Sequence, residues 1–238
     1  MRNHQAVLFR WTVVVCLLAT ALRSNAQTTQ GIGVGAFLNV PMVSGNSPLA
    51  KDEKLLLRAS PYVDYAISLR RWNFMIGAGV WNSTLANEII DTVGKATTVY
   101  SFNYLFAPVG VGFNVLDGKR WNVGLEGYAL LKYLMLVNAD VRSDNPALAI
   151  PVTHINGAEL DQFHLNKFGV ATGGGLFVSS AFGKILPKLG VGYLTDLKDA
   201  FNGTPVNYKF SHVYANVSVN YLIGYSERLE KWDHRVKW

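Results

Sequence analysis

The stretch Leu55-Leu56-Leu57-Arg58-Ala59-Ser60-Pro61-Tyr62-Val63-Asp64-Tyr65-Ala66-Ile67-Ser68-Leu69 decides the fold, because apolar and polar side chains alternate along it. Every odd-numbered position is apolar or aromatic, whereas the even-numbered positions carry Arg58, Asp64 and two serines. Successive side chains of a strand point to opposite faces, so the stretch predicts a strand with one greasy and one polar face. The i, i+3, i+4, i+7 spacing of an amphipathic helix is not found here.

The same alternation recurs along the chain of 238 residues. It predicts eight strands, at residues 30–39, 54–69, 72–85, 97–115, 120–136, 163–179, 187–196 and 209–225. In the fifth segment, Trp121, Leu125 and Leu131 fall on one face, and Glu126 and Lys132 fall on the other. We therefore expect an all-β protein, an eight-stranded antiparallel transmembrane β-barrel that spans residues 27–225.

Residues 1–26 are typical of a secretory signal peptide. Arg2 and Arg10 precede an apolar run at 11–22, and Ser24-Asn25-Ala26 offers small residues for cleavage before Gln27. An apolar run of about twelve residues is too short for a helix across the ~30 Å hydrocarbon core. Residues 226–238 are expected to form a short periplasmic tail, either an amphipathic helix or a disordered segment.

Charge and cysteine content exclude several classes of function. Removal of residues 1–26 takes away three arginines and lowers the formal net charge from +6 to +3, so nucleic-acid binding has no support. Cys16, the only cysteine, lies in the leader, which leaves no disulfide and no cysteine-based metal site. Only 16% of the residues are charged, against about 25% in soluble domains. This suggests that something other than water covers much of the surface.

Alternation alone does not tell which face points outward, and a soluble barrel that binds a ligand would have its apolar face inside. Three observations favour lipid outside. The polar face carries Arg58, Asp64, Glu126 and Lys132, which could neutralise one another as a network in a narrow lumen. Several segments exceed the ~9–11 residues of a tilted transmembrane strand. Aromatic residues recur near strand ends, as in interfacial girdles: Trp72, Tyr104, Phe106, Trp121, Tyr133, Tyr221 and Tyr225.

Prolines and glycines punctuate the strands. Pro61 and Pro108 each lack a backbone donor and are expected to mark bulges or strand ends. Glycine runs at 31–35, 77–79, 110–112 and 173–175 suit the crowded inner face of a small barrel. A phosphate-binding loop at 31–35 is excluded because no helix is predicted after it.

The connections alternate in length. Residues 70–71, 116–119 and 180–186 are short, and Asp117-Gly118 is a strong hairpin signal. Residues 40–53, 86–96, 137–162 and 197–208 are predicted to be longer, polar loops. Bacterial barrels keep short turns in the periplasm and long loops outside. The longest loop, 137–162, is therefore the expected contact surface for envelope protein partners.

The hairpin at 104–128 resembles the middle hairpin of a known family. The resemblance rests on the stretches Tyr104-Leu105-Phe106-Ala107-Pro108-Val109-Gly110-Val111-Gly112-Phe113, the Asp117-Gly118 turn, and Trp121-Asn122-Val123-Gly124-Leu125-Glu126-Gly127-Tyr128. In these the chain is similar to the small PorT-like outer-membrane β-barrel proteins of Bacteroidota, over about 27–225. The resemblance implies an outer-membrane barrel, and for some members a link to protein secretion.

Catalytic chemistry has weak support in the sequence. An outer-membrane lipid A hydrolase or protease would need Ser, His and carboxylate groups at the rim. The candidates are His154, Asp161, His164, Asp140 and Asp144 around the longest loop, and Ser211 with His212 in the last strand. None matches a family pattern. We expect no catalytic residues, and the alternatives left open are a rim-active enzyme and a narrow channel.

No cofactor and no metal site is expected, because a loop of ten residues separates His154 from His164 and no cysteine assists them. The protein is expected to act as a monomer, in contact with outer-membrane lipid, and to work through its loops or in a membrane complex.

Overall fold

The computed structural model describes residues 28–45, 53–91, 94–118, 121–143, 150–156, 165–198 and 208–225. The expected leader at 1–26 and tail at 226–238 lie outside these ranges. Among the described residues, no helix is long and apolar enough to cross a membrane. The strands are β1 (Thr28–Gly45), β2 (Glu53–Leu55), β3 (Arg58–Leu69), β4 (Trp72–Asp91), β5 (Gly94–Asp117), β6 (Trp121–Ser143), β7 (Ile150–Asn156), β8 (Phe168–Ser180), β9 (Ile185–Asp196) and β10 (Tyr208–Tyr225).

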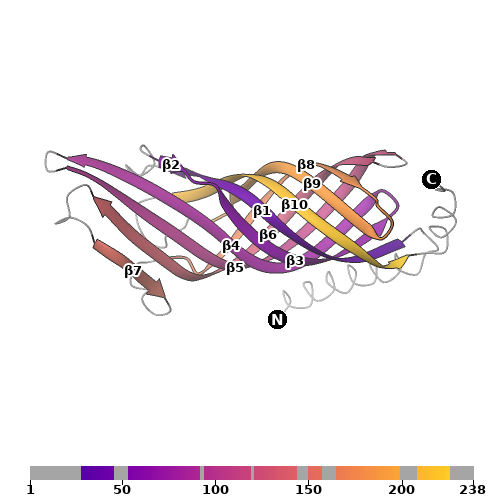
Figure 1. The fold of residues 1–238 in the computed structure, drawn as a ribbon, viewed down its shortest axis with the longest axis horizontal. Coiled ribbons are helices and arrows are strands. Elements are labelled where there is room, and N and C mark those ends of the chain that lie inside the picture. Colours follow the sequence, from indigo (N-terminus) through magenta and orange to yellow (C-terminus); the bar gives the residue numbers. More distant parts are fainter. Residues whose placement is uncertain are drawn as a thin grey trace, which may run out of the picture.

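Eight of these strands form a closed antiparallel ring (Figure 1). Around the ring the order is β4, β3, β1, β10, β9, β8, β6 and β5, and pairing of β5 with β4 closes it. The first and last strands meet along their whole length, from Thr29 opposite Tyr225 to Gly45 opposite Tyr208. The structure thus confirms the predicted eight-stranded barrel. The short strands β2 and β7 lie outside the ring, on β4 and β6 respectively.

The two ends of the barrel differ in their connections. At the turn end, two residues join β3 to β4, with Leu69 opposite Trp72, and a tight hairpin joins β5 to β6, with the Gly118 N–H donating to the Trp121 carbonyl. The turn between β8 and β9 includes Gly183, whose φ is +60°. The opposite end, which we call the loop end, has the hairpin between β4 and β5.

At the loop end, strands reach further than the sequence indicated. The predicted loop 86–96 is mostly a hairpin, because β4 and β5 stay paired up to Asp91 opposite Gly94. The predicted loop 137–162 contains the end of β6 and all of β7, and β1 runs to Gly45 inside the predicted loop 40–53. These stretches were predicted as loops because they contain many polar residues, although their strands continue beyond the apolar part of the outer face. Figure 1 shows β4, β5, β6 and β7 extending past the ring at this end.

Two further expectations about the strands need correction. The predicted strand 54–69 is broken at Leu56 and Leu57 into β2 and β3. Neither proline lies at a register shift. Instead, the β3–β4 ladder stops at Tyr62, next to Pro61, and the β4–β5 ladder skips Pro108 without changing register. The missing proline donor thus leaves a gap in the ladder, whereas the shifts in β5 occur at Asn103/Tyr104 and Asn114/Leu116.

The outer face of the ring is apolar and the inner face is mixed. The large apolar side chains that point outward are solvent-accessible on every ring strand, with Val34, Leu125 and Val191 each more than half exposed. Of the expected girdle, Trp72, Trp121, Tyr133 and Tyr221 are on this outer face. Tyr104 and Phe106 are instead buried inside the barrel, because the alternation of β5 turns even-numbered residues inward.

Glycines on the inner face make room for large rings. A Cβ on Gly35 would lie 2.6 Å from the Tyr62 ring and 2.8 Å from Ser218, and one on Gly110 would lie 2.8 Å from the Tyr128 ring. Contacts this short require neighbouring atoms to shift. At Gly35 and Gly110, crowding on the inner face thus explains the glycine, as the sequence predicted.

We expect Gly35→Ala to lower the free energy of unfolding by about 1–3 kcal/mol, because the added methyl overpacks the barrel interior. Urea titration of the refolded protein in detergent, followed by tryptophan fluorescence, measures the change. Gly127→Ala is the matched control, since its Cβ would meet nothing closer than 3.7 Å. Equal losses for the two variants would contradict the crowding argument.

Candidate functional site

A cluster of aromatic side chains fills the middle of the barrel. We call it the aromatic plug, and it consists of Phe37, Tyr62, Trp81, Phe106, Tyr128 and Tyr214. Phe37 lies at its centre, with ring centroids 5.1 Å from Tyr62, 5.3 Å from Tyr128 and 5.5 Å from Tyr214. Phe37 and Trp81 are fully buried. Offset and edge-to-face aromatic pairs of this kind stabilise a core beyond the area they bury.

A polar network begins at the phenol groups on one side of the plug. The Glu126 carboxylate accepts hydrogen bonds from the hydroxyls of Tyr128 (2.8 Å) and Tyr214 (3.2 Å), and it forms an ion pair with Lys188 at 2.6 Å. Asn216 continues the chain, because its amide donates to the Tyr128 oxygen and accepts from the Tyr62 hydroxyl. We call this set the Glu126 network. A buried carboxylate is tolerated only when it is paired and hydrogen-bonded in this way.

Small residues on two strands allow Glu126 and Lys188 to meet. Glu126 is on β6 and Lys188 is on β9, so β8 lies between them. Opposite Glu126 on β8 is Gly175, which has no side chain to block the approach. On β9, Gly190 also lacks a side chain, and the Glu126 carboxylate lies in the space that a Cβ on Gly190 would occupy.

A second ion pair lies toward the loop end of the plug. Lys132 on β6 donates to both oxygens of Asp196 at 2.6 and 2.8 Å, and both residues are buried. The ammonium group also lies 5.1 Å from the centroid of the Tyr104 ring. Such a geometry satisfies the charge of Lys132 by a bidentate contact and a cation–π contact.

The four polar residues singled out in the sequence therefore do not form one network. Glu126 and Lys132 point inward but take other partners, Lys188 and Asp196. Asp64 is buried near the turn end. Arg58 is exposed at the start of β3, where its Nε donates to Thr84 at 2.7 Å. The break at Leu56 and Leu57 leaves Arg58 at the loop end, away from the other three.

Sequence reasoning missed Lys188 and Asp196, although alternation along β9 was a usable signal. Both have the parity of Gly190 and Leu194, which face inward. What the sequence lacked was the register that puts Lys188 near Glu126 two strands away.

Only some of the expected rim candidates lie among the residues that the structure describes. Asp144, Asp161 and His164 lie outside the described residues, and nothing is described of the His154 side chain. Asp140 lies on β6 near the loop end. His212 is fully buried, against the Trp81 ring at 5.1 Å, and both its ring nitrogens lack a hydrogen-bond partner. Ser211 points to the opposite face and donates to Thr195, so it does not form a dyad with His212.

A closed antiparallel ring with an apolar outer face and a polar lumen is the architecture of an integral outer-membrane β-barrel. Hydrocarbon satisfies no backbone N–H or C=O group, and only closure removes the sheet edges. The protein therefore belongs to the class of small eight-stranded outer-membrane barrels and resides in the outer membrane.

Comparisons with known proteins found similarities to solved structures alone. No protein-family model matches the chain, and no curated protein matches it. Among solved structures, it is similar to Neisserial surface protein A, with 15% identity, a TM-score of 0.40, and coverage of 80% of this chain and 96% of that one. It is also similar to Ail of Yersinia pestis, with 11% identity, a TM-score of 0.36, and coverage of 81% and 99%. For OprG of Pseudomonas aeruginosa the identity is 10%, the TM-score 0.33, and the coverage 83% and 97%.

We expect Lys132→Met to destabilise the barrel by about 3–5 kcal/mol, because it leaves the Asp196 carboxylate buried without its partner. The double variant Lys132→Met/Asp196→Leu is expected to recover most of this loss, since neither charge then remains. Urea titration in detergent micelles measures both. Lys209→Met removes an exposed lysine from β10 and should change stability by less than about 0.5 kcal/mol. A double variant no more stable than Lys132→Met would contradict the pairing.

Proposed function

We propose that this protein is a non-enzymatic, monomeric outer-membrane barrel that works by presenting its loop end to envelope or extracellular partners. The observation that carries the proposal is the contrast between a filled lumen and an extended loop end. The aromatic plug closes the middle of the barrel, so the lumen offers no argument for a channel. At the loop end, in contrast, β4, β5 and β6 continue as paired strands well beyond the ring.

The loop-end extension is built for contact through side chains. Its strand order is β2, β4, β5, β6 and β7. The ring strand β8 pairs with β6 only up to Tyr133, and β7 takes its place beside β6 from Leu136 to Val141. Pro151 in β7 and a register shift opposite it, between Ala139 and Val141, interrupt regular pairing. Proline and bulges discourage a further strand from adding to an edge. A partner would therefore dock on the surface of the hairpins.

The finer family assignment is part of the same proposal. The hairpin that resembles the PorT-like barrels of Bacteroidota is the β5–β6 hairpin, in which Gly110 lies opposite Tyr128 and Pro108 opposite Leu130. Both Tyr128 and Glu126 of this hairpin take part in the Glu126 network. This placement supports a shared barrel core, and with it we propose that the partner is a component of an envelope complex, with secretion as one such role.

Site-specific photo-cross-linking in intact cells tests the docking proposal. A photoreactive residue is placed at Thr153 on β7 or Glu88 on β4, and at Gly183 in the turn between β8 and β9 as a control. We expect protein adducts of discrete mass at the loop-end positions and not at Gly183. Adducts at Gly183 alone, or no protein adduct at any position, would contradict a partner at the loop end.

Arginine substitutions at two positions along β9 test whether the outer face contacts lipid. Val191 lies in the middle of the strand and Leu197 just beyond its end, and both are more than half exposed. In bilayers we expect Val191→Arg to cost about 2–4 kcal/mol and Leu197→Arg at most about 1 kcal/mol.

Heat-modifiable gel mobility of both variants confirms that each is folded. Equal and small costs at the two positions would show that the outer face is not in hydrocarbon. The docking proposal could then still be examined, because the cross-linking readout does not depend on it.

A further inference from the structure

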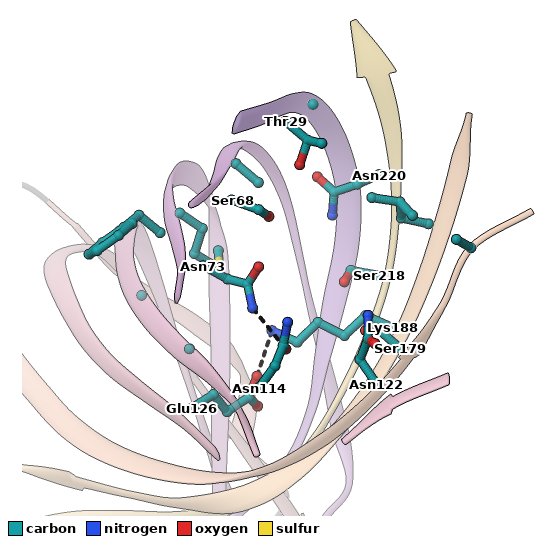
Figure 2. Close-up of a pocket in the computed structure, with 18 of the residues that line it drawn as sticks. Thr29, Ser68, Asn73, Asn114, Asn122, Glu126, Ser179, Lys188, Ser218 and Asn220 are labelled. Carbon is teal, nitrogen blue, oxygen red and sulfur yellow. Dashed lines mark hydrogen bonds and ion pairs between the residues drawn. The ribbon is translucent and has the colours of Figure 1, made fainter. Parts of the chain in front are cut away.

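The lumen between the aromatic plug and the turn end is hollow. A cavity of about 610 Å³ lies there and reaches the turn residues Arg70, Asp117 and Gly183, so it opens at the turn end. This volume is within the range of small-molecule sites, about 300–1,000 Å³. Figure 2 shows polar side chains from several strands around it, with Lys188 extending across toward Glu126. The labelled polar side chains are Thr29, Ser68, Asn73, Asn114, Asn122, Glu126, Ser179, Lys188, Ser218 and Asn220.

One carboxylate oxygen in the cavity wall has no donor. Asp64 is 6% exposed, and its Oδ1 atom has no hydrogen-bond partner. The nearest cation in the cavity, Lys188, already makes an ion pair with Glu126 at 2.6 Å. A buried carboxylate oxygen without a donor is costly, so Asp64 can receive an N–H donor from a ligand.

The strand register places a second acceptor beside Asp64. Gly33 on β1 lies opposite Asp64 on β3 and opposite Asn220 on β10. A Cβ on Gly33 would be within 2.5 Å of the Asp64 Oδ1 atom and in equally close contact with the Asn220 Oδ1 atom. The two oxygens therefore converge over the bare backbone of Gly33. The Asn220 Oδ1 atom also lacks a donor.

Two converging acceptors favour a ligand with several N–H donors. A primary ammonium group has three such donors and one positive charge, and it would satisfy both oxygens. A metal ion is disfavoured, because no group of three His, Cys, Asp or Glu side chains among the described residues could hold one.

Charge and polarity support the same ligand. Lys188 pairs with Glu126, so it is not available as an ion-pair partner for the Asp64 carboxyl in the inner cavity. The Asn73 amide donates to Asn114 at 3.1 Å, and both side chains line the wall together with several hydroxyl groups. A polar wall of this kind suits the uncharged remainder of a small hydrophilic molecule.

We propose that the turn-end cavity is a binding site for small molecules that carry a primary ammonium group, with Asp64 and Asn220 as the residues that receive the ammonium. The ligand enters from the turn end, because the aromatic plug closes the other side. The site is independent of any partner at the loop end.

Titration of the folded, isotope-labelled protein in detergent micelles tests the site. Propylammonium chloride is the probe, 1-propanol is the neutral analogue of the same size, and the backbone amide signals of Gly33, Asp64 and Asn220 are followed by NMR. We expect saturable shifts with propylammonium and none with 1-propanol. A charged hydrogen bond contributes about 1.5–3 kcal/mol, so Asp64→Asn should weaken binding by at least about tenfold.

Asp117→Asn is the matched control, because Asp117 lines the same cavity but is exposed at its mouth. It should bind propylammonium within about twofold of the unmodified protein, a difference of less than about 0.5 kcal/mol. Heat-modifiable mobility shows whether each variant is folded. If Asp64→Asn does not fold, the comparison of propylammonium with 1-propanol on the unmodified protein decides alone. Absence of saturable shifts, equal shifts with 1-propanol, or unchanged binding by a folded Asp64→Asn variant would overturn the proposal.

Discussion

Closure of the strand ring by β1 and β10 is the constraint on which the rest of the structure depends. These strands come from opposite ends of the described chain, and seventeen residue pairs join them, from Thr29/Tyr225 to Gly45/Tyr208. In hydrocarbon an open edge would leave a row of unpaired N–H and C=O groups, each of which costs several kcal/mol. Once the ring is closed, its curvature fixes a narrow interior in which large inward side chains compete for space.

That competition explains the division of the lumen into a filled part and a hollow part. Around the plug, inward glycines such as Gly35 and Gly110 lie directly against the rings of Tyr62 and Tyr128. Toward the turn end, the inward Gly33 lies against the short polar side chains of Asp64 and Asn220 instead, and a cavity remains beside them. Glycine on the inner face therefore permits either close packing or a cavity, depending on the residues that surround it.

The sequence was sufficient for the barrel and insufficient for its interior. Alternation in the strands and the Asp117-Gly118 turn predicted the ring, because both signals are local. The loop-end hairpins were missed because paired strands above the apolar belt lose the apolar alternation. The partners of Glu126 and Lys132 were missed for another reason. Lys188 and Asp196 are more than sixty residues away in the chain, and only the closed register brings them within reach. Arg58 has the right parity, but it is the first residue of β3, at the loop end, where it is exposed.

The arrangement of charges inside the barrel follows from the plug. Because aromatic rings separate the two sides, the Lys132–Asp196 pair lies apart from the turn-end cavity, and a buried charge on either side is costly unless it is paired there. The loop side meets this condition with one lysine and one aspartate, both buried. The turn side does not, because it contains two buried carboxyl groups, those of Glu126 and Asp64, and Lys188 forms an ion pair only with Glu126. If the barrel interior served stability alone, an asparagine in place of Asp64 would remove the imbalance at no cost in volume. A carboxyl group beside an open cavity instead fits the proposed ammonium ligand.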